Sequence, residues 1–333
     1  MIHSGSMPLP AGGKVLLTGA SGMIGSAIRS EFSGRRIQTL QLSRSTVDPG
    51  RGNGADAARS LQYVAVSISG EIPWNIRATP AVARPELLEG LSAAIHLSGA
   101  SLAAHRWTPG YKKEIVSSRV ESTRVLAQTL AGLQHPPKAL LVASAVGIYG
   151  HRGDEVLNEE SSKGEGFISD LCRDWEAAAQ PAVEAGIRVA YLRFGVALDG
   201  RGGALKKMLP LFRWGLGGRL GSGKQWMSWI AIQDLAAAAA FLVERDDLTG
   251  AFNMTAPNPV TNAEFARALG RRLHRPAVVP APTAALRAMM GEVAEEVLLA
   301  SQRAVPARLS AAGFRFAYPE IDKALEAVLA RRG

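Results

Sequence analysis

The sequence predicts an α/β fold in which a doubly wound parallel sheet is followed by a smaller, mostly helical C-terminal domain. Short apolar segments of strand length alternate with longer segments of helical periodicity through the first half of the 333-residue chain, as they do in parallel sheets. The first apolar segment runs straight into a glycine-rich turn and then into a helix-like segment. Beyond residue 200 the alternation stops, and glycine-rich segments and short helical stretches follow.

The glycine-rich turn lies within Lys14–Ser26, KVLLTGASGMIGS. The three glycines Gly19, Gly22 and Gly25 have separate uses: one permits a positive φ, one lets a pyrophosphate approach the backbone, and one lets helix and strand pack closely. The helix that follows would offer free N–H groups to phosphates. This order predicts a dinucleotide-binding turn of the Rossmann type, although the spacing G-x-x-G-x-x-G also suits an ordinary strand-to-helix turn.

A second strand is expected at Arg36–Leu42, and the residues after it bear on the choice of cofactor. Sites for NAD usually place an Asp or Glu about 20 residues beyond the glycines, where it binds the ribose 2′-hydroxyl. This sequence has Ser43 and Arg44 there, and an arginine can pair with a 2′-phosphate through two hydrogen bonds. The pattern therefore favours NADP(H) over NAD, the alternative being a solvated surface arginine.

The remaining strands are expected to be short and buried, with helices between them. Ser144 stands at the carboxyl end of one such strand, which is where ligands bind in open α/β sheets. Asp234 and Asn262 are expected to cap the starts of two later helices. The strands are expected at Leu61–Val66, Ala93–Leu97, Ala139–Ala143 and Arg188–Phe194, and the longer helices at Tyr111–Leu133 and Phe167–Gly186.

Composition argues against several classes of protein. No apolar run reaches about 18 residues, so no transmembrane helix is expected, and residues 1–13 are expected to be a disordered leader or tag and not a secretory signal. The net charge of +9 is spread along the chain, so no nucleic-acid partner is expected. The six histidines show no ligand spacing, and no metal is expected. The single cysteine, Cys172, excludes an internal disulfide and fits a cytoplasmic location.

Two glycine-rich segments, Gly200–Gly203 and Gly215–Gly223, open the second half of the chain, with lysines and arginines between and within them. Such a segment can be a mobile, positively charged lid over an anionic ligand. It can equally be a solvated loop, and the sequence leaves both interpretations open.

Several blocks of sequence together resemble one known family. TGASGMIG, HLSGA, SRVESTRVL, SASAVGIYG, LRFGVAL and WMSWIAIQDLA resemble the extended short-chain dehydrogenase/reductase (SDR) superfamily. RWTPGYKKEIVSSR, LCRDWEAAA, GLGGRLGSGKQWMSWI and LLASQRAVPARLSAAGFRF are similar to its atypical branch of "epimerase family" proteins. The resemblance covers nearly the whole chain from Lys14, and the later blocks are more specific than the glycine motif.

The resemblance implies an NADP-binding Rossmann domain over residues 14–199, to which residues 226–250 return. Residues 200–225 and 251–333 would form a C-terminal substrate or lid domain, and a homodimer is one state that the resemblance allows. The implied cofactor contacts are Gly19, Ser21, Gly22, Met23, Ile24 and Gly25 at the pyrophosphate, Ser43 and Arg44 at the 2′-phosphate, Leu97, Ser98 and Gly99 along the adenine–nicotinamide track, and Glu114 and Arg119 on the long helix.

The catalytic residues depart from the pattern of that superfamily. Ser144 matches its catalytic serine, but its usual acid/base pair, Y-x-x-x-K, occurs nowhere in this sequence. The matching places hold Phe167-Ile168 and Leu171-Cys172, which supply no such pair. Tyr149 is the best substitute by position, with Asp170 a weaker one, and the alternative role of Tyr149 is that of a packed aromatic.

Three functions follow from these observations. The first is an NADP(H)-binding oxidoreductase or epimerase that acts on an unknown small molecule with a replaced acid/base. The second is a non-catalytic NADPH-binding regulatory or sensor protein, which the missing pair favours. The third is a sugar-nucleotide epimerase whose basic segment Lys206–Lys224 holds a substrate diphosphate. Resemblance of fold does not choose among them, so whether the protein is an enzyme stays open.

Overall fold

The central feature of the protein is a seven-stranded parallel sheet. The computed structural model describes residues 13–44 and 71–330, and within them the strands follow the order β11-β7-β5-β4-β1-β2-β3. The chain builds outward from β1 in one direction and from β4 in the other, so β1 and β4 flank the switch point where such sheets bind ligands. The strands are β1 (Lys14–Thr18), β2 (Gln38–Arg44), β3 (Glu71–Trp74), β4 (Ala93–His96), β5 (Ala139–Ala145), β7 (Arg188–Phe194) and β11 (Gly250–Met254).

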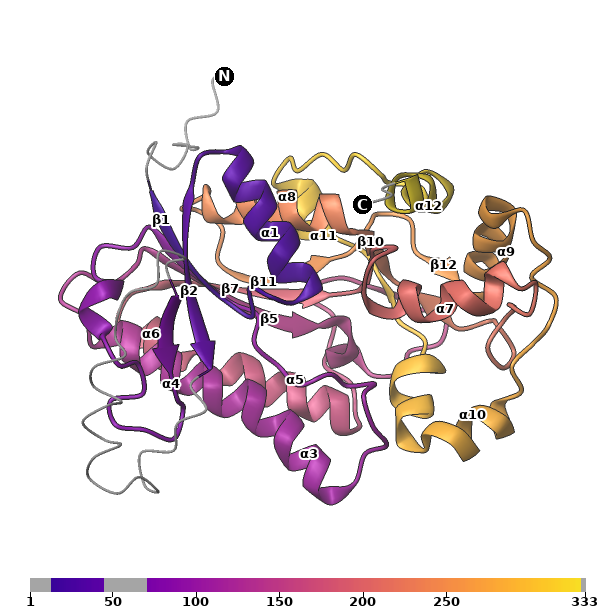
Figure 1. Ribbon diagram of the computed structural model, residues 1–333, viewed down its shortest axis with the longest axis horizontal. Coiled ribbons are helices and arrows are strands. Elements are labelled where there is room, and N and C mark those ends of the chain that lie inside the picture. The colour runs from indigo at the N-terminus through magenta and orange to yellow at the C-terminus, as the bar shows by residue number, and fades with distance from the viewer. Residues whose placement is uncertain (1–12, 45–70, 331–333) are drawn as a thin grey trace.

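Helices cover both faces of the sheet, which confirms the doubly wound fold (Figure 1). Successive strand residues point to opposite faces. Leu17 of β1 therefore joins a core cluster with Ile28 and Phe32, while its neighbour Leu16 joins the opposite cluster with Leu126. One face carries α1 (Met23–Gly34) and α8 (Ile232–Val243), and the other carries α3 (Pro109–Val116), α4 (Ser122–Ala131), α5 (Phe167–Ala177) and α6 (Gln180–Glu184).

Two of the strands differ from the sequence expectations. Strand β2 begins two residues later than expected, because Arg36 makes a turn with a φ of 59°. The long helix is confirmed as α3 and α4, joined by one π-helical turn, η2 (Ser117–Glu121). Strand β3 was not expected, and the strand predicted at Leu61–Val66 lies outside the described residues.

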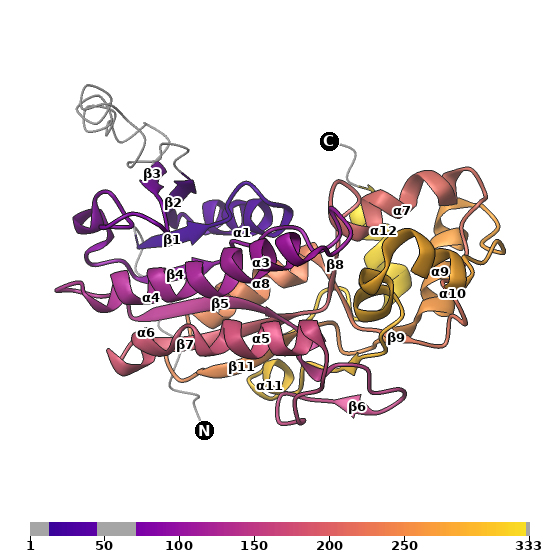
Figure 2. The ribbon, with the colours of Figure 1, turned by 90° about the horizontal axis from the view of Figure 1, so that it is seen from below.

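A smaller, mostly helical region follows the sheet. Helices α7 (Gly203–Arg213), α9 (Asn262–Leu273) and α10 (Thr283–Met290) of this region gather at one end of the molecule, beyond the carboxyl ends of the strands (Figures 1 and 2). Short strands tie it to the sheet region, since β6 pairs with β13 and β8 pairs with β10. No helix in the described ranges has the length and apolar character needed to cross a bilayer. The elements of this region and its ties are β6 (Val156–Leu157), β8 (Val196–Leu198), α7 (Gly203–Arg213), β9 (Trp226–Met227), β10 (Trp229–Ala231), β12 (Val260–Thr261), α9 (Asn262–Leu273), α10 (Thr283–Met290), η4 (Ala294–Leu298), β13 (Arg303–Ala304), α11 (Ala307–Ala311) and α12 (Ile321–Ala330).

The glycine-rich segment Gly215–Gly223 runs beside residues 279–281. The Val279 amide donates to the Gly217 carbonyl at 3.2 Å, and the Gly221 amide donates to the Ala281 carbonyl at 2.8 Å. There is little room between the two segments, because a Cβ on Gly218 would lie 2.1 Å from the Val279 carbonyl oxygen. The segment is therefore part of the scaffold of the C-terminal region.

The two expected helix caps are wrong, and both residues hold other segments. Asp234 lies in the first turn of α8, and its carboxylate accepts hydrogen bonds from the backbone of Ala317 and Tyr318, each at 2.9 Å. Helix α9 is capped by Thr261 in a capping box with Glu264. Asn262 instead accepts a hydrogen bond from the Leu220 amide at 2.7 Å. The local sequence indicated where both helices begin, but it could not show that these two side chains bond to segments far away in the chain.

Candidate functional site

The glycine turn after β1 is packed as a dinucleotide cradle requires. Gly19 has a φ of +67°, and a Cβ on it would lie 3.0 Å from the Leu97 backbone at the end of β4. A Cβ on Gly25 would lie 2.3 Å from the Gly19 carbonyl oxygen. The positive φ and the end of β4 therefore disfavour a side chain at Gly19, and at Gly25 a side chain is excluded because the start of α1 packs directly against the turn.

The start of α1 is free to bind an anion. Gly22 occupies the N-cap position, no side chain caps the helix, and its first turn holds no acidic residue. The first N–H groups of the helix are therefore available to a phosphate, and its dipole favours one. Of the predicted pyrophosphate contacts, Ser21 and Gly22 are exposed, Met23 and Ile24 are half-buried, and Gly25 is buried.

A buried chain of hydrogen bonds holds the ends of β1 and β4 together. Thr18 Oγ1 lies 2.7 Å from His96 Nδ1, and His96 Nε2 lies 3.0 Å from Ser122 Oγ. Ser122 Oγ donates to the Ser118 carbonyl at 2.8 Å, so it accepts from Nε2–H and leaves Nδ1 as the acceptor. Burial lowers the pKa of His96 to about 3. The imidazole is thus a neutral core group, and it fixes the strand end that leads into Leu97.

The predicted nucleotide track, Leu97 to Gly99, packs directly against the Arg119 side chain. The Arg119 guanidinium donates to the Ala100 carbonyl at 2.8 Å and lies 5.1 Å from the centre of the Trp175 ring. A Cβ on Gly99 would lie 3.0 Å from the guanidinium carbon. Burial lowers the pKa of Arg119. Arg119 therefore supports the track from below, while its direct contact with a cofactor stays a prediction.

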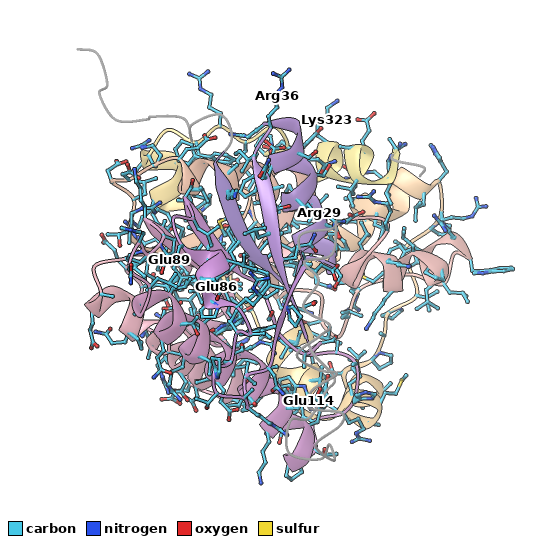
Figure 3. All side chains as sticks on the ribbon, turned by 60° about the vertical axis from the view of Figure 1, so that its left-hand side comes forward. Arg29, Arg36, Glu86, Glu89, Glu114 and Lys323 are labelled. Atoms are coloured by element: carbon cyan, nitrogen blue, oxygen red, sulfur yellow. The ribbon has the colours of Figure 1, made fainter. Side chains whose placement is uncertain are left out.

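Other predicted cofactor contacts are spread more widely. Ser43 is half-buried near the end of β2. Arg44 is the last residue of β2, paired in register with Trp74, and its side chain lies outside the described part of the chain. Glu114 is exposed on α3, and Figure 3 shows it well separated from Arg29 on α1. The roles predicted for Ser43, Arg44 and Glu114 stay predictions.

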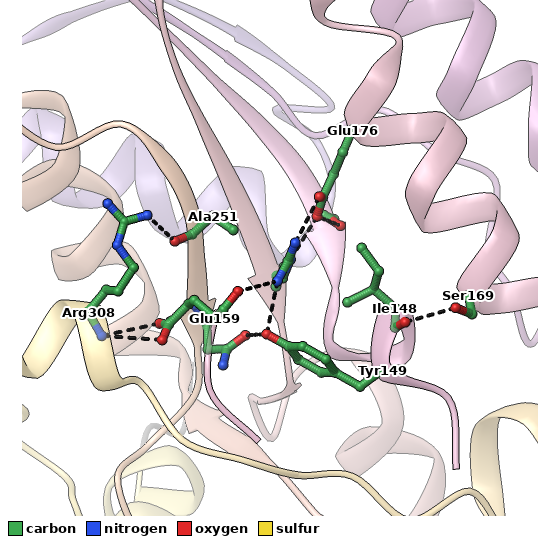
Figure 4. Close-up of polar contacts among 10 residues, drawn as sticks. Ile148, Tyr149, Glu159, Ser169, Glu176, Ala251 and Arg308 are labelled. Atoms are coloured by element: carbon green, nitrogen blue, oxygen red, sulfur yellow. Dashed lines mark hydrogen bonds and ion pairs between the residues drawn. The ribbon is translucent and has the colours of Figure 1, made fainter. Parts of the chain in front are cut away.

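Both predicted catalytic hydroxyls join one buried polar network (Figure 4). Ser144 Oγ donates to Glu176 Oε1 at 2.8 Å. The Tyr149 hydroxyl donates to Asn253 Oδ1 at 2.8 Å and accepts from Arg193 Nη1 at 3.0 Å. Ser144 is 1% exposed and Tyr149 has no exposed surface. Their catalytic roles stay predictions, and the geometry gives both hydroxyls partners inside the protein.

Within this network, the Glu176 carboxylate stabilises the charged form of Arg193. Burial opposes the charge of Arg193, but hydrogen bonds and the charge of Glu176 outweigh it and raise the pKa of the guanidinium. Burial raises the pKa of Tyr149, so its phenol stays protonated at neutral pH. The sequence analysis missed Glu176, Arg193 and Asn253. The signal was a charge on an otherwise apolar face, because Glu176 lies eight residues after Ile168 on the buried side of α5.

The start of α5, where the superfamily places its acid/base pair, is apolar here. The Phe167 ring packs edge-on against Trp107 at 5.1 Å between centroids. Ile168 and Leu171 are buried, and burial raises the pKa of the Cys172 thiol to about 12. Asp170 is exposed and pairs with Arg173. The structure thus places no tyrosine and no lysine at these positions.

A glycine cradle at the switch point of a doubly wound sheet defines a dinucleotide-binding α/β protein of the SDR fold. The chain belongs to the NAD dependent epimerase/dehydratase family, whose profile matches residues 15–254. Residues 281–328 match a second profile, described as a domain of unknown function, DUF1731. The family profile thus spans the sheet, and the second profile falls in the C-terminal region.

Similar proteins cover almost the whole chain. Epimerase family protein Mb2239 of Mycobacterium bovis is 39% identical over 319 residues, which are 96% of this chain and 98% of that protein. Epimerase family protein SDR39U1 of Bos taurus is 36% identical, over 95% of this chain and all of its own length. The crystal structure of human SDR39U1 with NADPH is 32% identical, covers 96% of this chain and 99% of its own, and has a TM-score of 0.83.

Proposed function

We propose that the protein is an NADP(H)-binding oxidoreductase or epimerase of the SDR type that acts on a small molecule. The observation that carries the proposal is the glycine cradle, in which Gly25 lies so close to the Gly19 carbonyl that a Cβ would stand 2.3 Å from it. The uncapped start of α1 faces the same turn. That human SDR39U1 was crystallised with NADPH supports the same cofactor here. A cytoplasmic location, which the single cysteine favours, is part of the proposal.

Each part of the cofactor has a proposed partner in the chain. The first-turn N–H groups of α1, from Met23 to Gly25, hold the pyrophosphate. Ser43 and Arg44 hold the 2′-phosphate, and residues 97–99 line the path toward the nicotinamide. When bound, the nicotinamide supplies hydride transfer to or from a carbonyl or alcohol carbon. The chain contributes the orientation of the ring and the exclusion of water.

An oxidoreductase or epimerase must move a proton to or from its substrate, and both proposed catalytic hydroxyls already have partners within the protein. Ser144 Oγ would have to exchange Glu176 for a substrate oxygen before it could orient a carbonyl. Tyr149 would have to leave Asn253 and Arg193, and its burial opposes this. Catalysis by either hydroxyl therefore requires that it first break a hydrogen bond inside the protein.

The engaged hydroxyls favour the second candidate function, a sensor that binds NADPH without turnover. Tyr149 has no exposed surface, and the expected Y-x-x-x-K pair is absent from the sequence. A screen of carbonyl compounds against NADPH consumption separates the two candidates. Consumption above background that the Ser144→Ala variant loses supports the enzyme, whereas binding without consumption supports the sensor.

The experiment that tests the cofactor is a titration with NADPH and with NADH, followed by nicotinamide fluorescence. We expect tight NADPH binding, and Arg44→Ala to weaken NADPH about tenfold or more with little effect on NADH, because the variant removes a charge-assisted contact to the 2′-phosphate. Arg36→Ala, an exposed arginine in the turn before β2, is the matched control. Failure of both nucleotides to bind at micromolar concentration would overturn the oxidoreductase and the sensor alike.

A further inference from the structure

An unusual group of exposed apolar side chains lies at the end of α7. Trp214 is 82% exposed, and near it Leu211 is 57%, Leu216 58% and Val278 76% exposed. Single exposed aliphatic residues are common on proteins, but a tryptophan and several aliphatic residues in one patch mark an interaction site. We call these four residues the Trp214 surface.

The Trp214 surface is built from two segments that are held together. Arg275 Nε donates to the Arg213 carbonyl at 3.0 Å, and the Val279 amide donates to the Gly217 carbonyl at 3.2 Å. Gly215 packs against the Pro276 ring, where a Cβ would be 3.7 Å away. The apolar side chains therefore stand on a fixed backbone, so a partner would lose little free energy in ordering this backbone.

A shallow, open groove adjoins the Trp214 surface and shares Val278 with it; we call it the basic groove, after the basic residues in its lining. The groove has a volume of about 590 Å³, and four of the residues that line it, Arg267, Arg271, His274 and Arg275, are basic. None of the residues that line it is acidic. Arg271 forms an ion pair with Asp322 at 2.8 Å, but both side chains are 61% exposed, so water screens this pair strongly.

The surface lies apart from the proposed cofactor site. Helix α7 begins beside the glycine cradle, since a Cβ on Gly203 would lie 3.0 Å from the Met23 side chain, and the Trp214 surface is at the opposite end of this helix. Helix α9, which carries Arg267 and Arg271, lies at the end of the molecule remote from β1 in Figures 1 and 2. The glycine cradle is at the start of α1, beside the sheet. The proposed cofactor site therefore does not account for the apolar character of this surface.

We propose that the Trp214 surface and the basic groove together dock an acidic segment of a partner protein, anchored by a large apolar side chain. Charge complementarity selects an acidic partner for a groove lined by basic residues. An apolar anchor is needed because Trp214, Leu211 and Leu216 would stay in water without one. Nucleic acid would leave the aliphatic residues without apolar contacts.

The test selects partners without assuming their sequence. Random peptides of about 12 residues displayed on phage are selected on the full chain and counter-selected on the double variant Trp214→Ser/Arg267→Glu. Enriched peptides are then synthesised and titrated by fluorescence anisotropy. Both substituted residues are at the surface and distant from the cradle, so unchanged NADPH titration and circular dichroism verify that each variant is folded.

We expect enriched peptides to carry acidic residues and an aromatic or large aliphatic residue. Trp214→Ser and Arg267→Glu should each weaken their binding about tenfold or more. Met289→Ser, which changes a side chain 73% exposed on α10, should not weaken it. No enrichment over the double variant, or enrichment of peptides without acidic residues, would overturn the proposal. So would binding only to phosphatidylglycerol vesicles, or a dimer in sedimentation that Trp214→Ser abolishes, because each identifies another occupant.

Discussion

Glu176 and Arg193 form a two-point ion pair inside the protein, with Nε–Oε1 at 2.8 Å and Nη2–Oε2 at 3.0 Å. The side chains are 8% and 6% exposed. The pair joins α5 to β7, and it also accepts from the Ser144 hydroxyl and donates to that of Tyr149. One ion pair thus positions both predicted catalytic hydroxyls.

Breaking this pair should destabilise the protein strongly. Arg193→Leu leaves the Glu176 carboxylate buried without its cation, for which the usual loss of unfolding free energy is about 3–5 kcal/mol. Urea denaturation followed by circular dichroism measures the loss. Lys323→Ala, which removes an ion pair whose side chains are 75% and 59% exposed, is the control and should leave the midpoint unchanged. Equal midpoints for Arg193→Leu and the wild type would contradict the assignment.

Two glycines of α1 offer a matched test of the cradle. Gly25→Ala places a Cβ 2.3 Å from the Gly19 carbonyl oxygen, so the turn must open and NADPH binding should weaken by about a hundredfold or be lost. Gly34→Ala, at the other end of the same helix, meets nothing within 4 Å and should leave NADPH binding unchanged. Titration of both variants with NADPH, followed by nicotinamide fluorescence, measures the difference. Tight NADPH binding by Gly25→Ala would show that the cofactor lies elsewhere.

His96 should make stability depend on pH. Its pKa is lowered to about 3 in the folded protein, whereas the unfolded chain takes up the proton near pH 6.5. Below pH 6.5 the unfolded chain gains a proton on His96 that the folded protein does not take up, so the free energy of unfolding falls as the pH drops from 6.5 toward 3. Between pH 7 and pH 5 the loss is about 2 kcal/mol.

The measurement is a urea midpoint at both pH values for the wild type and for His96→Asn. We expect the wild type to lose more stability than His96→Asn on acidification, because the variant lacks the imidazole. His135→Asn, which changes an exposed histidine, should behave as the wild type does. An identical pH dependence in His96→Asn and the wild type would show that His96 is not buried as a neutral group.

Cys172 should react only when the protein unfolds. Burial raises the pKa of its thiol to about 12, and the side chain is 2% exposed, so neither thiolate nor access is available in the native state. Because it is the single cysteine, labelling by N-ethylmaleimide reports on it alone. We expect native labelling at least about a hundredfold slower than in urea. Rapid labelling of the native protein would show that α5 opens locally.

The sequence predicted the parts of the fold that depend on local pattern. Strands β1, β4, β5 and β7 stand where apolar segments indicated them, and the helix expected at Phe167–Gly186 is present as two helices, α5 and α6, with Pro181 in the first turn of the second. The glycine turn was also readable, because Gly19 and Gly25 are required by contacts only a few residues away.

Long-range contacts could not be predicted in the same way. Ser144 was singled out by its position on the strand, but its partner Glu176 is 32 residues away. Asn253, which holds Tyr149, is 104 residues away. Where a hydroxyl points depends on which helix and strand pack beside it, and local periodicity carries no such information. Asp234 was misassigned for the same reason, since the 317–318 backbone that it binds comes much later in the chain.

Arg308 reaches from the C-terminal region back to the edge of the sheet. Its guanidinium donates to the carbonyls of Ala251 and Thr249, both at 2.7 Å, and lies 4.2 Å from the centre of the Phe252 ring. Residue 308 lies within the second family profile, and residue 252 within the first. Recombination that exchanged one gene segment without the other would separate these contacts. We therefore expect the two segments to be inherited together.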